Sequence, residues 1–338
     1  MREPAITTIG TGTGAGLGLI AATFTACHDD GAINLDAIER QAEDLVRQRL
    51  RGVFVCGTTG ESASLTTAER MEVTQRWREV AGSDLEVIVH VGHTSLGDAQ
   101  ALAAHAERVG AAGIAAVPPF YFRPGSVPEA VEFAARIATA APRTPFFYYH
   151  IPSLTGVALP MAAFLPAAAA AIPTFGGIKF THENLAEYAT CLDWADGRYE
   201  LFFGRDEVLL AALALGARSA VGSTYNFSAP LFHRVGDSFD RGDLAEARRL
   251  QTLANRMVGV AVAHGGIPAF KAMTRWFGVD CGPCRPPLTT LGPAQVESLR
   301  AELERVGFFD AVAEIPSPPT PSPAAAGEGA YPASVAQV

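Results

Sequence analysis

Residues 175–180 read Phe-Gly-Gly-Ile-Lys-Phe, a short and largely apolar run that carries one charged side chain, Lys179. A run of this length without strict apolar–polar alternation is typical of a parallel strand buried on both faces. Similar runs recur at intervals of about 30 residues, and a helical pattern separates each from the next. The runs are Gly18–Ala22, Gly52–Cys56, Val87–Val91, Gly113–Val117, Pro145–Tyr149, Phe175–Phe180, Glu200–Phe203 and Arg218–Val221.

These strand-and-helix units fill roughly the first 225 residues, which is the usual extent of a (β/α)8 barrel. A doubly wound open sheet is the alternative, but it usually has fewer strands, and we find no phosphate-binding loop for it. We therefore predict an α/β fold, a (β/α)8 TIM barrel with a C-terminal helical extension that contains helices at 239–263 and 293–306. The expected organisation is a flexible N-terminal segment at 1–16, the barrel at 17–226, the extension at 227–312 and a disordered Pro/Ala-rich tail at 313–338.

The composition argues against some classes of molecule as binding partners. Hydrophobic residues make up 49% of the 338-residue chain, enough for a large core, and the net charge of −9 argues against binding to nucleic acid or an anionic membrane. No apolar run is long enough for a signal peptide or a membrane span. The five scattered cysteines are expected to be free thiols in a cytoplasmic protein.

Lysine is scarce in this chain. Among 26 basic side chains only Lys179 and Lys271 are lysine. A desolvated lysine can act as an amine nucleophile, whereas arginine keeps its proton. Lys271 lies in a helical pattern at residues 270–277 and is expected to be a solvated surface charge, which leaves Lys179 as the candidate nucleophile.

The carboxyl ends of the strands carry the groups that could do chemistry, because a barrel of this kind holds its active site there. Ile178 and Phe180 flank Lys179, and such apolar neighbours lower a lysine pKa. The alternative is a lysine that extends from a strand end into water. The other candidates are Thr58 and Thr59 in a glycine-flanked turn, the phenol of Tyr149, the carboxylates of Asp206 and Glu207, and the hydroxyl of Ser223.

Four motifs contain most of these residues: Gly57-Thr58-Thr59-Gly60-Glu61, Tyr149-His150-Ile151-Pro152, Gly177-Ile178-Lys179 and Gly222-Ser223-Thr224-Tyr225-Asn226. Their order and spacing resemble the dihydrodipicolinate synthase/N-acetylneuraminate lyase family over about residues 15–310. Within that family, the segments at 148–157 and 203–207 are most similar to the N-acetylneuraminate lyases.

The resemblance implies a role for each matching residue. Lys179 would form a Schiff base with a keto sugar acid or pyruvate, and Tyr149 would shuttle protons. Thr58 and Thr59 would hold the pyruvate carboxylate. The polyhydroxyl part of the sugar would contact Thr181, Gly204, Asp206, Glu207 and Ser223, and Tyr121 would lie near the site. The resemblance also implies a homotetramer and neither a metal nor an organic cofactor.

Several residues bear on the choice of substrate. Dihydrodipicolinate synthases typically carry an arginine where this chain has Leu154, so the resemblance favours cleavage of N-acetylneuraminate to N-acetylmannosamine and pyruvate. Arg205, Arg123 and Phe180 depart from the expected pattern and could favour another acid. The alternatives are an aldolase or dehydratase for a different 2-keto-3-deoxy sugar acid, and a non-catalytic keto-acid sensor.

Overall fold

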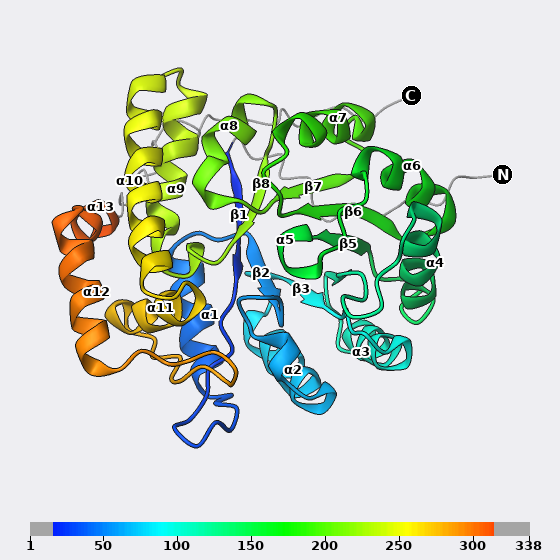
Figure 1. The fold of residues 1–338 in the computed structure, drawn as a ribbon, viewed down its shortest axis with the longest axis horizontal. Coiled ribbons are helices and arrows are strands. Elements are labelled where there is room, and N and C mark those ends of the chain that lie inside the picture. Colours follow the sequence, from blue (N-terminus) through cyan, green and yellow to red (C-terminus); the bar gives the residue numbers. More distant parts are fainter. Residues whose placement is uncertain (1–15, 314–338) are drawn as a thin grey trace, which may run out of the picture.

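The computed structural model describes residues 16–313, and its strands form a closed parallel barrel in the order β1 to β8 (Figure 1). The predicted (β/α)8 barrel is therefore confirmed, and each strand begins and ends within one residue of its predicted bounds. The strands are β1 (Gly18–Ala22), β2 (Gly52–Val55), β3 (Glu86–His90), β4 (Gly113–Ala116), β5 (Phe146–His150), β6 (Phe175–Phe180), β7 (Glu200–Phe203) and β8 (Ser219–Gly222).

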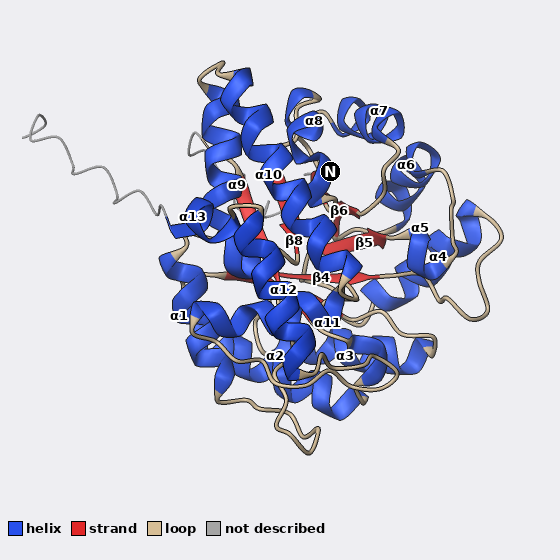
Figure 2. Ribbon diagram, turned by 60° about the vertical axis from the view of Figure 1, so that its left-hand side comes forward, coloured by secondary structure: helices blue, strands red, loops and turns tan. Residues whose placement is uncertain are grey.

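Helices surround the barrel on its outside (Figure 2). The second of them begins with the capping box typical of such a sequence, in which Thr66 and Glu69 bond to each other's backbone N–H groups. The surrounding helices are α1 (Ala37–Arg47), α2 (Thr67–Ala81), α3 (Leu96–Arg108), α4 (Val127–Ala138), α5 (Pro152–Thr155), α6 (Met161–Ala171), α7 (Leu185–Ala195) and α8 (Leu209–Ala214), with the 3₁₀ turns η1 (Ser62–Ser64) and η2 (Asp206–Val208).

The strands contribute to two separate layers of buried side chains. One layer lies between the strands and the surrounding helices. The second fills the barrel interior and is rich in aromatic and branched residues: Ile20, Ala22, Phe54, Ile88, Ala115, Val117, Phe147, Tyr149, Ile151, Phe202 and Val221. Successive side chains on a strand point to opposite layers, so the register of each strand decides which residues enter the barrel.

A bulge in β6 turns Lys179 toward the interior. Phe175 and Ile178 both pack in the outer layer although they are three positions apart, which strict alternation would not allow. The extra residue is accommodated at Gly176 and Gly177, where the register against β5 shifts. Gly177 has φ +139°, and a Cβ there would overlap the carbonyl oxygen of Glu200. Only glycine fits this backbone, and the glycine pair therefore places Lys179 inside the barrel.

The C-terminal extension packs on one side of the barrel, with α9 and α10 side by side and α12 and α13 outside them (Figure 1). The single helix predicted at 239–263 is in fact two, because Gly242 has φ +78° and the Asp243 side chain then caps α10 by accepting from Glu246 N. The elements are α9 (Tyr225–Asp240), α10 (Leu244–Ala263), α11 (Ile267–Met273), η3 (Thr274–Phe277), α12 (Pro293–Arg305) and α13 (Phe308–Ala313).

The predicted flexible segment at 1–16 and tail at 313–338 fall almost entirely outside the described residues. Within residues 16–313, no helix is long and apolar enough to cross a membrane.

The prediction that Lys271 is a solvated surface charge is wrong. Lys271 is only 1% exposed, and its Nζ atom donates to Glu61 Oε1 and to the carbonyl oxygen of Pro283, both at 2.7 Å. The helical pattern at 270–277 showed an amphipathic helix but gave no sign of Glu61, which is distant in sequence. The buried carboxylate of Glu61 is what compensates the charge of this lysine.

Candidate active site

Lys179 lies inside the barrel, one residue before the carboxyl end of β6. Its side chain is almost fully buried, and its Nζ atom lies 3.7 Å from the centre of the Phe54 ring and 4.0 Å from the centre of the Tyr149 ring. Parallel register brings Tyr149 of β5 directly beside Lys179. The amine is thus held between two aromatic faces in an apolar interior.

Burial sets the protonation state of this amine. Desolvation lowers the pKa of Lys179 to about 7, and the negative charge of Asp206 opposes the shift. In a substantial fraction of the molecules Lys179 is therefore an unprotonated amine at neutral pH, which is the form that attacks a carbonyl carbon. The second lysine, Lys271, is committed to its ion pair with Glu61.

The phenol of Tyr149 is positioned by hydroxyl groups. Tyr149 OH and Thr58 Oγ1 lie 3.3 Å apart and share a hydrogen bond. Burial raises the pKa of Tyr149 to about 12, and the hydroxyls of Thr58 and Thr181 lower it in part. The phenol keeps its proton near neutral pH, so it can donate that proton to a bound group and can accept another only as it gives up its own.

The turn after β2 provides a second pair of hydroxyls. Thr59 Oγ1 lies 2.6 Å from Ser223 Oγ, which follows β8. Glu61 holds the end of this turn in place. Its carboxylate accepts from Lys271 Nζ and, at 2.7 Å, from the backbone N–H of Arg285. This buried anchor fixes the turn that carries Thr58 and Thr59.

A buried carboxylate lies close enough to Lys179 to raise its pKa. Asp206 begins η2, is 7% exposed, and accepts from Thr224 Oγ1 at 2.6 Å. Burial raises the pKa of Asp206 to about 6 despite this hydrogen bond. Gly222 makes room for the group, because a Cβ at that position would overlap the Asp206 carboxylate.

Thr181 and Gly204 are also adjacent at this end of the barrel. A Cβ at Gly204 would overlap the Thr181 hydroxyl, so glycine is required for their close approach. Thr181 Oγ1 is buried and has no aligned hydrogen-bond partner among the described residues. The Thr181 hydroxyl lies close enough to the Tyr149 phenol to lower the pKa of that group.

The unexpected residues near the site are accounted for by their contacts. Arg205 forms ion pairs with Glu183 at 2.7 Å and with Glu207 at 3.4 Å, so its charge is balanced. Phe180 faces the outer layer, where its ring lies 5.3 Å from that of Tyr188. The charge of Arg205 is thus neutralised locally, and Phe180 does not enter the barrel.

Tyr121 stands apart from this group of residues. It lies in the connection between β4 and α4, is 78% exposed, and packs edge-on against the ring of Phe122, which is 85% exposed. The structure thus brings Lys179 together with the predicted hydroxyls, phenol and Asp206, and places Glu207 at their edge.

Phe54 was not among the predicted site residues. Its ring lies against the amine, and it also packs edge-on against Tyr149 at 5.4 Å between centroids. Alternation along β2 could have indicated its inward direction, since Val53 and Val55 pack in the outer layer.

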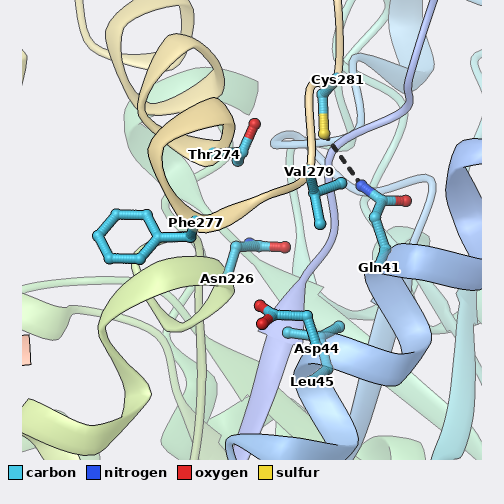
Figure 3. Close-up of a pocket in the computed structure, with 8 residues that line it drawn as sticks. All are labelled: Gln41, Asp44, Leu45, Asn226, Thr274, Phe277, Val279 and Cys281. Atoms are coloured by element: carbon cyan, nitrogen blue, oxygen red, sulfur yellow. Dashed lines mark hydrogen bonds between the residues drawn. The ribbon is translucent and has the colours of Figure 1, made fainter. Parts of the chain in front are cut away.

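A small separate pocket lies between α1, the start of α9 and the segment at 274–281 (Figure 3). Gln41 of α1 lies at one side of it and donates to Cys281 Sγ at 3.1 Å. Asp44, Asn226 and Thr274 are further polar residues of its wall. None of the predicted site residues lines this pocket, so it is distinct from the barrel mouth.

Comparison with known proteins places the chain among relatives of defined activity. The family model described as "Dihydrodipicolinate synthetase family" matches residues 15–306. The N-acetylneuraminate lyase of Gallus gallus is 39% identical over 298 residues, which cover 87% of this chain and 97% of that protein.

Solved structures agree with that match. The N-acetylneuraminate lyase of Proteus mirabilis has a TM-score of 0.84 and 35% identity, and the match covers 86% of this chain and 99% of that one. A structure described as a "Ruminococcus gnavus sialic acid aldolase catalytic lysine mutant" has a TM-score of 0.82 and 27% identity, covering 87% of this chain and 96% of that one.

Proposed function

The chain belongs to the dihydrodipicolinate synthetase family, and we propose that it is an N-acetylneuraminate lyase, which cleaves N-acetylneuraminate reversibly to N-acetylmannosamine and pyruvate. The observation that carries this proposal is the buried amine of Lys179 beside the phenol of Tyr149. The relative described as a catalytic lysine mutant supports a lysine in this role.

The first half of the reaction uses the free amine. Lys179 Nζ attacks the C2 ketone of the open-chain sugar acid, and loss of water leaves a protonated imine. This cation accepts the electron pair of the C3–C4 bond as that bond breaks, while the C4 hydroxyl loses its proton. N-acetylmannosamine leaves as the aldehyde, and an enamine of pyruvate remains on Lys179.

The second half returns the enzyme to its starting state. A proton adds to C3 of the enamine, and water hydrolyses the imine to release pyruvate and the amine. We assign the proton transfer at the C4 oxygen to a relay through Tyr149, whose hydroxyl bonds to Thr58: the phenol takes the C4 proton as it gives its own proton to the substrate carboxylate. Because the protonated imine is itself the electron sink, the chemistry requires neither a metal nor an organic cofactor.

The two ends of the substrate are proposed to bind to two adjoining groups of residues, which meet where Thr59 bonds to Ser223. Thr58 and Thr59 would hold the carboxylate of the pyruvate portion. Asp206 and Glu207, with the hydroxyls of Thr181 and Ser223 and the space at Gly204, would accept and donate hydrogen bonds to the hydroxyls of the sugar. Carboxylates suit this second role because each can accept from more than one hydroxyl group.

Leu154 favours a sialic acid over a substrate that carries a second carboxylate group. It lies in α5 and is 61% exposed, and its side chain offers no charge to a distal carboxylate. The test is pyruvate release from N-acetylneuraminate and from a panel of other 2-keto-3-deoxy sugar acids. Faster release from N-acetylneuraminate is expected, and absence of release from it while another acid is cleaved would assign the other substrate.

We further propose that the protein acts in the cytoplasm as a homotetramer. The five cysteines are all free and buried, as expected in a reducing compartment. Tyr121 and Phe122, in the connection between β4 and α4, present exposed aromatic side chains that a neighbouring subunit would cover. Light scattering of the purified protein gives the mass, and a monomer would contradict this assembly.

A further inference from the structure

One oxygen of the buried Asp206 carboxylate is left free. Oδ2 accepts from Thr224 Oγ1 and, at 3.4 Å, from Thr224 N, whereas Oδ1 has no hydrogen-bond partner among the described residues. The phenol of Tyr225 lies close enough to lower the Asp206 pKa, yet no aligned hydrogen bond joins it to Oδ1. A buried carboxylate oxygen without a donor is a binding position for a ligand hydroxyl.

The turn that carries Asp206 is too short for its own backbone hydrogen bonds to keep it rigid. η2 covers only Asp206–Val208, and Glu207 is its middle residue. The side chain of Gln251, in α10, crosses to this turn and bonds on both sides of it. Its Nε2 donates to the carbonyl oxygen of Asp206 at 3.0 Å, and its Oε1 accepts from Leu210 N at 2.9 Å.

Gln251 is itself fixed in place. It is 8% exposed, and its Nε2 also donates to Asn255 Oδ1 at 2.8 Å, one turn further along α10. α10 contacts both η2 and α8 and packs along α9 (Figure 1). The C-terminal extension therefore reaches the edge of the active site through one amide side chain.

We infer that Gln251 is a positioning residue that sets the geometry of Asp206 and Glu207 and thereby determines binding of the polyhydroxyl part of the substrate. This inference rests on the proposed function. The amide offers both the donor for the Asp206 carbonyl and the acceptor for Leu210 N at one position. A carboxylate at 251 keeps the acceptor and loses the donor, and a methionine loses both.

The pyruvate half of the site is built from other elements. Lys179, Tyr149 and Thr58 lie on β6, β5 and the turn after β2, and none of the hydrogen bonds given above for Gln251 reaches them. Loss of Gln251 is therefore expected to weaken sugar binding without affecting imine formation with pyruvate. A change in uniform binding appears in KM and leaves kcat less affected.

The experiment uses the full-length protein with the variants Gln251→Met and Gln251→Glu. Gln48→Met is the control, because Gln48 is also a buried glutamine, at 7% exposure in the turn after α1, but bonds to Asp44 and to the Asn226 carbonyl. Two quantities are measured on each: the rate of borohydride trapping with pyruvate alone, and KM and kcat for sugar-acid cleavage.

Gln251→Met is expected to raise KM for the sugar acid by about 10-fold or more, since a displacement near 1 Å can cost about 100-fold, while trapping stays within about 2-fold. Gln251→Glu should show a smaller rise, and Gln48→Met none. Equal losses of trapping and cleavage in both Gln251 variants would overturn the inference, as would an unchanged KM. Wild-type protein that traps no pyruvate would instead refute the proposed function.

Discussion

Lys179 Nζ lies 4.0 Å from the centre of the Tyr149 ring, because the two residues are register partners on adjacent parallel strands. Burial moves their pKa values in opposite directions, to about 7 for the amine and to about 12 for the phenol. Between these values both groups are uncharged, so a free amine nucleophile stands beside a protonated phenol. This pairing is the basis of the proposed mechanism.

Replacement of Lys179 by Met is expected to stabilise the protein at low pH and to have less effect at high pH. The unfolded lysine has a pKa of 10.5 and the folded one a pKa of about 7, so the unfolded chain binds more protons between these values. Wild-type stability therefore rises with pH across this window, and burial of the charged amine below it costs on the order of 5 kcal/mol.

The measurement is denaturant unfolding of both proteins at about pH 6 and about pH 9.5. The difference in free energy of unfolding should be larger at the lower pH. A stability difference that is the same at both pH values would show that the amine is not desolvated as described.

Asp206→Asn is expected to lower the pKa of Lys179 further, because the carboxylate charge raises it in the wild type. The rate of borohydride trapping with pyruvate alone should rise with pH around about 7 in the wild type, as the amine loses its proton. In the variant this rise should shift to lower pH. A shift to higher pH would contradict the electrostatic coupling between the two residues.

Tyr149→Phe is expected to leave trapping by pyruvate intact and to reduce cleavage by about 10²- to 10⁴-fold, the usual contribution of a positioned acid or base. Tyr148→Phe is the matched control. Tyr148 is the preceding residue of β5, faces the outer layer against Phe164, and has a buried hydroxyl without a hydrogen-bond partner among the described residues. Similar cleavage rates in the two variants would remove Tyr149 from the mechanism.

Gly177→Ala is expected to disturb the bulge of β6 and with it the direction of Lys179, because the added Cβ overlaps the carbonyl oxygen of Glu200 and φ is +139°. Both stability and trapping should fall. Gly259→Ala, in the middle of α10 with open space around its Cβ position, should instead stabilise by roughly 0.5–1 kcal/mol. Full trapping activity in Gly177→Ala would show that the bulge is not required.

The sequence was sufficient to predict the barrel, because apolar runs at a regular spacing indicate strands buried on both faces. It did not reveal the bulge at Gly176 and Gly177, since alternation alone does not show where register shifts. Periodicity likewise misassigned Lys271, whose partner Glu61 is 210 positions away. Contacts over such separations depend on tertiary packing.

The contact of Gln251 with the turn at Asp206 is another contact between residues distant in sequence that the sequence did not reveal. The helix at 244–263 was recognisable as part of a helical extension, but nothing in its pattern indicates which residue of it reaches the site. The fold brings together a helix of the extension and a turn that follows β7, and the side chain that joins them is visible only in the structure.

The most direct test of the central claim is borohydride reduction in the presence of pyruvate, followed by peptide mass analysis. The chain has two lysines, Lys179 and Lys271, and the second is held in a buried ion pair. The account predicts a reduced pyruvate adduct on the peptide that contains Lys179 and none in the Lys179→Met variant. An unmodified Lys179, or an adduct on Lys271 instead, would contradict it.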